Sequence, residues 1–270
     1  MSDPFPKRIV CLTEEPTEIL YRLGEQDRIV GISGFTVRPP QARREKPKVS
    51  AFTSARIGQI LALEPDLVIG FSDIQADIAR ELIKAGVEVW ISNHRSVQGI
   101  LDYTIRLSHW VGAAERGAAL VAQMQAAIAH ARARAAGFRR RPRVYFEEWD
   151  EPRISCIRWV AELLRIAGGD DIFPELAAAS LGKDRILADD EAIIARQPEI
   201  FLASWCGKKF RPDAVRARPG WSEVPALRQG NLFELKSPII LQPGPAAILD
   251  GLPAMSDIFA RWQATLGAPG

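Results

Sequence analysis

Short apolar segments alternate with amphipathic segments along the first third of the chain. Segments such as Leu67–Phe71 are apolar throughout and only about five residues long, which favours buried strands. In residues 76–85 the apolar side chains recur at helical spacing, and Gly86 follows directly, which is typical of a helix end. Strands that alternate with helices of this length predict βαβ units and a parallel sheet. The strands expected here are 8–12, 28–32, 67–71 and 87–91, and residues 34–56 are expected to form a loop-rich stretch.

The middle of the chain has a different pattern. Residues 96–136 contain no proline, and their apolar side chains recur at helical spacing from Ile100 to Ile128. Gly112 and Gly117 allow a bend or a short break. We interpret this stretch as one long helix, or two collinear helices, of about 35–40 residues. Because this exceeds the ordinary length of a helix, we expect it to connect two bodies.

A second group of alternating strands and helices follows, and part of it repeats a unit of the first. Residues 57–71 and 190–204 each read as a short helix, a turn that contains Pro65 or Pro198, and an apolar strand. Such turns also recur by chance in α/β proteins, so that alternative stays open. The pattern predicts an α/β fold with an N-terminal lobe in residues 1–97, a linking helix in 98–137 and a C-terminal lobe in 138–270.

Composition narrows the classes of function. The net charge of +2 and the basic clusters beside proline or glycine, Arg38–Arg44 and Arg139–Arg143, argue against a nucleic-acid role. No segment approaches the roughly 20 apolar residues that span a bilayer, so we expect a soluble protein without membrane insertion. The three cysteines are an odd number at wide spacing, which fits a reducing compartment. We therefore expect a cytoplasmic protein, or a periplasmic one if a leader precedes this chain.

Motifs of common enzymes are missing from the sequence. It contains no Gly-x-Ser-x-Gly elbow, no phosphate-binding glycine-rich loop and no His-x-x-x-His pair. This favours a binding protein that is not an enzyme and has no intrinsic cofactor. An enzyme that processes a bound metal chelate remains the alternative, and it would use Cys206 with His94, or Glu148 with Asp150.

Several segments carry a resemblance to a known family. They include RIVCLTEEPTEIL at 8–20, LEPDLV at 63–68, the stretch 159–169 that ends in Ala-Gly-Gly, and PGP at 243–245. With these segments the chain resembles the helix-linked, or class III, periplasmic binding proteins, most of all those for cobalamin (vitamin B12) or iron siderophores. The resemblance implies two Rossmann-like lobes of parallel sheet joined by a single long backbone helix. It also implies a small-molecule ligand, such as cobalamin or another metal chelate, in the cleft between the lobes, and we expect a monomer.

In open α/β sheets, ligands bind outside the carboxyl ends of the strands. The candidate ligand-binding residues at these ends are Thr13, Glu14, Glu15, Phe35, Phe71, Ser72, His94, Glu148, Trp149, Trp205, Cys206 and Gln242. The resemblance adds Phe52, which lies in a loop similar to one that carries a ligand-flanking aromatic residue in the family. We expect Trp149 and Trp205 to stack on a flat ligand, with packing in the core of the lobe as the alternative. His94 and Cys206 can contact a metal, although a loop histidine is more often simply exposed and a free cysteine simply buried.

The resemblance also implies a partner. Importer members of the family carry an exposed glutamate on each lobe, and these pair with arginines of an ABC permease. Glu191 matches the second of these positions, whereas Gly58 occupies the first. We therefore expect a relative with altered docking, and a conventional importer subunit for B12 or an iron siderophore is the alternative. Arg38, Arg56, Arg153 and Arg158 would suit an anionic siderophore, whereas a corrinoid favours an aromatic lining.

Overall fold

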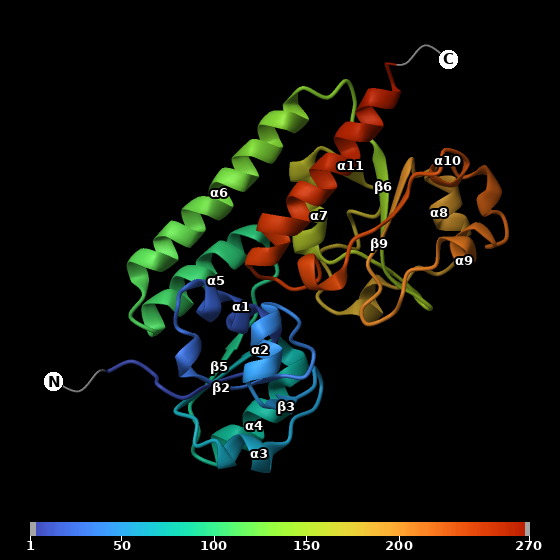
Figure 1. The fold of residues 1–270 in the computed structure, drawn as a ribbon. Helices are drawn as coiled ribbons and strands as arrows, with labels where there is room; N and C mark the ends of the chain where they lie inside the picture. The colour runs from blue at the N-terminus through green and yellow to red at the C-terminus, as the bar shows by residue number, and fades with distance from the viewer. Residues whose placement is uncertain (1–3, 268–270) are drawn as a thin grey trace. The chain divides into compact units, whose positions relative to one another are not determined.

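The computed structural model describes residues 4–267, which divide into two compact units (Figure 1). The first unit comprises the described residues up to His94 together with Gln98–Met124. The second comprises Arg95–Val97 and the described residues from Gln125 onward. Each unit contains its own five-stranded sheet and its own hydrophobic core.

All strand pairs in the first sheet are parallel, so their carboxyl ends meet at one edge. The strands are β1 (Ile9–Cys11), β2 (Ile29–Ser33), β3 (Lys48–Ser50), β4 (Leu67–Phe71) and β5 (Val89–Ser92), in the order β3-β2-β1-β4-β5. The helices between them are α1 (Glu14–Arg22), α2 (Pro40–Glu45), α3 (Ile57–Ala62) and α4 (Ala76–Lys84). The central strand β1 is completely buried, as expected for its apolar sequence.

Residues 34–56 are rich in loops, as expected, but they also contain α2 and β3, which the sequence did not predict. The prolines there suggested loops. However, Pro40 occupies the first turn of α2, where its missing N–H costs nothing. Pro47 comes directly before β3, which is short and lies at the sheet edge. The four predicted strands are confirmed as β1, β2, β4 and β5.

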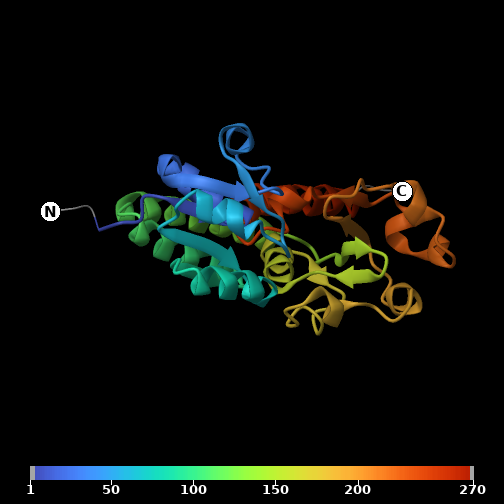
Figure 2. The same cartoon turned by 90° about the horizontal axis from the view of Figure 1, so that it is seen from below.

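The second sheet is also mainly parallel. Its strands are β6 (Arg143–Asp150), β7 (Arg153–Ser155), β8 (Asp170–Asp171), β9 (Ile200–Ala203) and β10 (Leu232–Glu234). Their order is β10-β9-β6-β7, with β8 paired to β6. The one antiparallel pair in the described sheet is the hairpin of β6 and β7, which Figure 2 shows as two neighbouring yellow-green arrows. The sequence did not predict this hairpin, because Glu147–Asp150 reads as solvated charge rather than as the end of a long strand.

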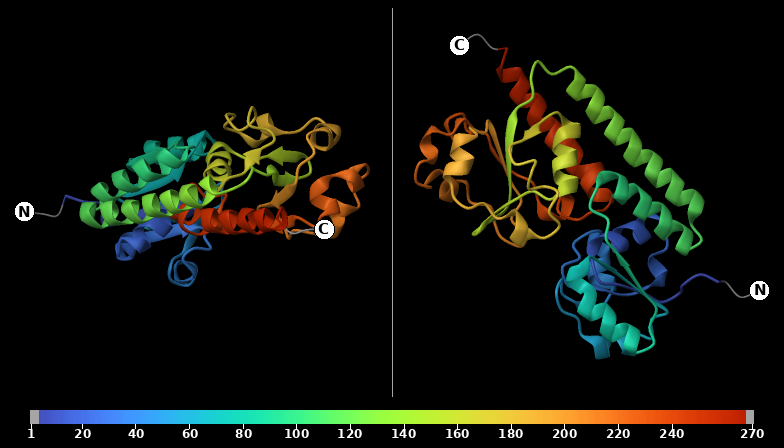
Figure 3. Two further views of the ribbon diagram at one scale, coloured as in Figure 1. Left: turned by 90° about the horizontal axis from the view of Figure 1, so that it is seen from above. Right: turned by 180° about the vertical axis from the view of Figure 1, so that it is seen from behind.

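The helices of the second unit are α7 (Arg158–Ala167), α8 (Glu191–Ala195), α9 (Pro212–Arg216), α10 (Pro225–Arg228) and α11 (Leu252–Thr265), which follows a π-helical turn at Ala247–Gly251. Helix α11 packs beside α7 (Figure 3), and both bury apolar side chains against the sheet. Gly168 ends α7 in the left-handed conformation, at φ 97°, as the Gly-Gly sequence predicts.

The internal repeat is visible in the backbone. Glu64 and Gln197, each directly before the proline of the repeat, share the left-handed conformation, with φ of 46° and 47°. The acidic residue after each proline also has the same role. Asp66 accepts hydrogen bonds from the backbone N–H groups of Lys7 and Arg8, and Glu199 accepts one from that of Arg143, so each carboxylate holds the start of the first strand in its unit.

The helical stretch in the middle of the chain is not collinear. It consists of α5 (Val97–Trp110) and α6 (Ala114–Ala136), and Figure 1 shows the chain turning back sharply between them. Gly112 lies in this turn at φ 70°, a conformation that L side chains rarely adopt. Gly117, in the first turn of α6, lies so close to α5 that a Cβ atom there would lie 2.0 Å from the Ser108 hydroxyl. The two glycines thus permit a tight helical hairpin, and α6 alone continues into the second unit.

We predict that Gly117→Ala destabilises the protein by about 1–3 kcal/mol, because the added methyl group overlaps the Ser108 side chain. Thermal denaturation should show a fall of several degrees in Tm. The control is Gly58→Ala in α3, where a Cβ meets no atom within 4 Å. Adding Ser108→Gly to the Gly117→Ala variant should restore most of the loss. Equal Tm values for the two alanine variants would contradict the tight contact.

Candidate functional site

The candidate residues follow the carboxyl ends of the parallel strands in each unit, and the two groups are described separately. In the first unit, Thr13 lies between β1 and α1, and its hydroxyl donates a hydrogen bond of 2.7 Å to Oε1 of Glu15. Glu14 and Glu15 are only 5% and 1% exposed. Among the described residues, the Oε2 atoms of both glutamates have no hydrogen-bond partner. Polar groups left in this way are rare in proteins and often belong to sites that accept a ligand, a proton or water.

Burial makes these two carboxyl groups weaker acids than an ordinary glutamate. Burial, together with the charge of the neighbouring Glu15, raises the pKa of Glu14 to about 8. It also raises the pKa of Glu15 to about 7, against the opposing effect of the Thr13 hydrogen bond. Near pH 7 Glu14 is therefore mostly protonated and Glu15 about half protonated, and a protonated carboxyl can donate a hydrogen bond.

Exposed apolar side chains surround the same strand ends. Phe35, which follows β2, is 55% exposed, and Phe52, which follows β3, is 36% exposed. The buried amide of Gln75 holds the backbone of Phe52 and Phe71 in place. It donates a hydrogen bond to the Phe52 carbonyl at 3.0 Å and accepts one from the Phe71 N–H at 2.9 Å. Phe71 itself and Ser72 are buried. Of the four candidates in these loops, Phe35 and Phe52 therefore present surface to a ligand.

His94 belongs to an aromatic cluster. Its ring stacks on Tyr103 with the centroids 4.3 Å apart and meets the edge of Phe71 at 5.3 Å. Its Nδ1 shares a hydrogen bond of 2.6 Å with the Ser92 hydroxyl. Within residues 4–267, no group of three or more His, Cys, Asp or Glu side chains is placed to hold a metal ion. A contact from His94 to the metal of a bound chelate stays a prediction.

In the second unit, a buried carboxylate lies in the second half of β6. Glu147 is completely buried and accepts four hydrogen bonds: two of 2.8 Å from Arg218 and two of 3.1 Å, from the Tyr145 hydroxyl and the Trp205 indole. Burial alone would lower the pKa of Arg218, but the Glu147 carboxylate raises it above its ordinary value. Because each polar group of this pair is matched, the buried charges stabilise one arrangement of the loop that carries Arg218.

The next residue, Glu148, is bound by a second arginine. Arg185 is 2% exposed and donates to both carboxylate oxygens of Glu148, at 2.7 and 3.1 Å, and also to the carbonyl of Ser155. Solvated charge is therefore the wrong interpretation for Glu147 and Glu148. A ligand contact from Glu148 stays a prediction, although its carboxylate already has a partner. No sequence pattern pointed to Arg185 or Arg218, which lie 37 and 71 residues from their partners.

The two candidate tryptophans differ. Trp205 is 4% exposed and packs in the core against Phe210, so the alternative of core packing describes it. Trp149 is half-buried, and its indole N–H donates to the Glu151 carbonyl at 2.7 Å. Lys208 lies 5.5 Å from the centroids of both rings. Of this pair, Trp149 is the ring that retains exposed surface.

The remaining candidates are placed as follows. Cys206 is exposed after β9, and Gln242 is half-buried in the connection from β10 to α11. Glu191 is exposed at the start of α8, and Gly58 is exposed in α3. Docking through Glu191 stays a prediction. Cys156 is buried, and burial raises the pKa of its thiol well above the ordinary value, so it is unreactive.

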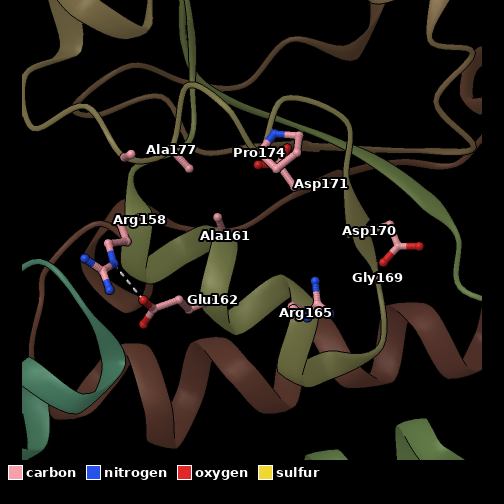
Figure 4. A pocket seen from close by; sticks show the side chains of 10 residues that line it. Arg158, Ala161, Glu162, Arg165, Gly169, Asp170, Asp171, Pro174 and Ala177 are labelled. Carbon is pink, nitrogen blue, oxygen red and sulfur yellow. Dashed lines mark hydrogen bonds and ion pairs between the residues drawn. The ribbon is translucent and has the colours of Figure 1, made fainter.

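A pocket of about 490 Å³ lies beside α7 in the second unit (Figure 4). Its charged lining consists of Arg158, Glu162, Arg165, Asp170 and Asp171. Most of these groups have protein partners: Arg158 pairs with Glu162 at 2.8 Å, and the Cys156 thiol and the Phe173 N–H donate to Asp171. From the sequence, Arg158 was expected only as a residue that would suit an anionic siderophore.

Comparison with known proteins identifies the family. The model of the periplasmic binding protein family matches residues 9–239. The chain belongs to this family. The vitamin B12-binding protein of Vibrio parahaemolyticus is 26% identical over 248 residues, which cover 90% of this chain and 86% of that protein. The periplasmic heme-binding protein RhuT from Roseiflexus sp. RS-1, in its apo form, has a TM-score of 0.83 at 26% identity, over 95% of this chain and 99% of that one.

A second solved structure, the periplasmic vitamin B12-binding protein BtuF of Vibrio cholerae, has a TM-score of 0.77 at 22% identity over 96% of this chain and 99% of that one, which shows the shared fold. The predicted family and the α/β fold with two lobes are confirmed. Members of this family are binding proteins rather than enzymes. The cytoplasmic expectation finds no support in these comparisons. In the described residues, no helix is both long and apolar enough to cross a membrane.

We predict that Arg218→Met destabilises this periplasmic binding protein by about 3–5 kcal/mol, because it leaves the Glu147 charge buried without a partner. Urea unfolding measures the change. The matched control is Arg216→Met, which breaks the exposed pair of Arg216 and Asp213 and should cost less than about 1 kcal/mol. Similar losses in both variants would show that the buried pair has no special role.

A second prediction concerns pH. The pKa of Glu14 rises from 4.5 to about 8, so the folded protein keeps a proton that the unfolded chain releases. The contribution of Glu14 to stability should therefore be full below pH 4.5 and decline as the pH rises to about 8. Glu14→Gln should raise Tm at pH 8.5 by several degrees and change it little at pH 4.5. Glu81→Gln, an exposed residue of α4, is the control. A gain that is the same at both pH values would contradict the assignment.

Proposed function

We propose that this protein binds a bulky metal chelate, with a corrinoid such as cobalamin as the first candidate. The observation that carries this proposal is the set of aromatic rings with accessible surface at strand ends: Phe35 and Phe52, which are exposed, in the first unit and Trp149, which is half-buried, in the second. The names of relatives support it, because the Vibrio parahaemolyticus protein is a vitamin B12-binding protein. Haem is the next candidate, from the name of the Roseiflexus protein.

A flat macrocycle suits such rings. An aromatic side chain offers a large apolar face and loses little conformational entropy when a ligand stacks on it. The backbone at Phe52 is held by Gln75, and in the second unit the pair of Glu147 and Arg218 holds β6 two residues before Trp149. The site is therefore largely preformed, as sites for small molecules usually are.

The polar periphery of a corrinoid also has possible partners. A corrinoid carries carboxamide side chains, whose carbonyl oxygens accept hydrogen bonds. Thr13, Glu14 and Glu15 follow β1, and the raised pKa values of both glutamates keep carboxyl protons available near neutral pH. We propose that these carboxyl groups donate to amide carbonyls of the ligand. No resident cofactor is needed, because the chelate itself is the ligand.

We further propose that the protein serves as the binding subunit of an ABC importer and works in the periplasm. The family match and the periplasmic vitamin B12-binding protein BtuF support this. Glu191, exposed at the start of α8, is the proposed docking carboxylate for the permease. Gly58 lacks a side chain at the corresponding place in α3, so docking would depend more strongly on the second unit.

The proposal is tested by titrating the purified protein separately with cyanocobalamin, dicyanocobinamide, haemin and a ferric siderophore. Absorbance and Tm are measured at each step. A ligand at 100 times its Kd should stabilise the protein by about 2.7 kcal/mol, which is several degrees for a chain of this size. If none of the four changes either signal, the chelate-binding function is wrong.

We predict that Trp149→Ala weakens chelate binding about tenfold or more while the protein stays folded, because the ring is only half-buried. The matched control is Trp110→Ala, which removes a tryptophan that is 36% exposed on α5, away from the strand ends. Equal losses of affinity in the two variants would rule out stacking on Trp149.

A further inference from the structure

An exposed lysine lies across the candidate stacking surface of the second unit. The ammonium group of Lys208, in the loop after β9, donates to the two carboxylate oxygens of Asp150 at 2.8 and 2.6 Å. The same nitrogen lies 5.5 Å from the ring centroids of Trp149 and Trp205. One cation therefore connects the ends of β6 and β9 and lies over the ring that we propose as the stacking platform.

We propose that Lys208 recognises a peripheral anionic group of the ligand and leaves Asp150 as the ligand stacks on Trp149. This inference rests on the chelate-binding function proposed above. It adds a specificity-determining residue and a property of the ligand, namely an anionic oxygen group at the edge of the macrocycle.

The Lys208 contact is suited to exchange, in contrast to the two arginine pairs nearby. The Lys208 side chain is 43% exposed, and an ion pair that water can reach is only weakly held. Arg218 and Arg185 are 9% and 2% exposed and bind their carboxylates through two bonds each, so they hold the loops rather than move. A lysine also has a long, flexible stem and a compact charge that can point to a new partner.

Stacking and exchange are coupled by geometry. Because the ammonium lies over the Trp149 ring, a macrocycle that covers this face displaces it towards the edge of the ligand. There the ammonium loses Asp150 and the indole, and an anionic group on the ligand replaces both. A ligand with a neutral edge offers no such replacement, so it should bind without help from Lys208.

Two kinds of chelate share the required chemistry. Cobalamin carries a phosphodiester in its nucleotide loop, and haem carries two carboxylates. Cobinamide has the same corrin ring as cobalamin but lacks the phosphodiester. Comparing the three chelates therefore tells which group Lys208 binds. Cyanocobalamin offers a phosphate, haemin offers carboxylates, and dicyanocobinamide offers neither.

The experiment measures the Kd of these three chelates for the wild type, Lys208→Gln, Lys209→Gln and Asp150→Asn. Lys209 is the matched control, because it is the adjacent exposed lysine. For the anionic chelate that the wild type binds, Lys208→Gln should weaken binding about tenfold, whereas Lys209→Gln should change it less than about twofold. Asp150→Asn removes the competing carboxylate and should tighten binding severalfold. Cobinamide affinity should be the same in the wild type and in Lys208→Gln.

Several results would overturn the inference while leaving the chelate-binding function intact. They are equal weakening of cobalamin and cobinamide by Lys208→Gln, equal effects of the two lysine substitutions, and weaker binding of the anionic chelate in Asp150→Asn. Binding of cobinamide alone would also exclude an anionic requirement. If the wild type binds none of the three chelates or the siderophore, the proposed function fails first, and the inference fails with it.

Discussion

The second unit depends on a carboxylate with no access to water. Glu147 ends the regular part of β6, and its two oxygens bind Arg218, Tyr145 and Trp205. A charge in such a place is stable only with its full set of partners, so the loop after β9 and the segment that carries Arg218 must take one conformation. The half-buried Trp149 packs on the same core cluster. The position of the candidate stacking ring therefore follows from an ion pair that has no direct contact with a ligand.

The two units position their first strand with the same local backbone arrangement. In each, a short helix ends at a left-handed residue before a proline, and the next acidic side chain holds the backbone N–H at the start of the first strand. The first strand is then in register with the strand of the repeat. The carboxyl ends of the strands thus come together at one edge, where the loops are free to differ between the units. The two units therefore share this backbone arrangement although their loops differ: the first has buried glutamates there, and the second has buried pairs of arginine and glutamate.

Local patterns in the sequence predicted much of this fold. Apolar runs located four strands of the first sheet, and the Gly-Gly sequence after Ala167 located the end of α7. Such local patterns could not predict pairings between residues that lie far apart in the sequence. Arg218 reads as one of several arginines in a polar stretch, and only the folded chain brings it to Glu147, 71 residues away. The acidic run at 147–150 looked solvated for the same reason, and Trp205 looked available although the core encloses it. Phe35 was found because its position after a predicted strand depends on chain order alone, whereas Phe52 follows a strand that was not predicted and was found through the family resemblance.

The Gln75 amide affects which substitutions this protein can accept during evolution. It is completely buried and bonds the backbone of Phe52 and Phe71, and Gly70 leaves the space for it, since a Cβ there would lie 2.5 Å from its oxygen. The partners of this amide are main-chain groups: a carbonyl, which every amino acid provides, and an N–H, which every amino acid except proline provides. The rings in these loops can therefore be exchanged for other side chains while the loops stay in place. A family built in this way can acquire new cargo by substituting single surface residues, without having to evolve a new backbone.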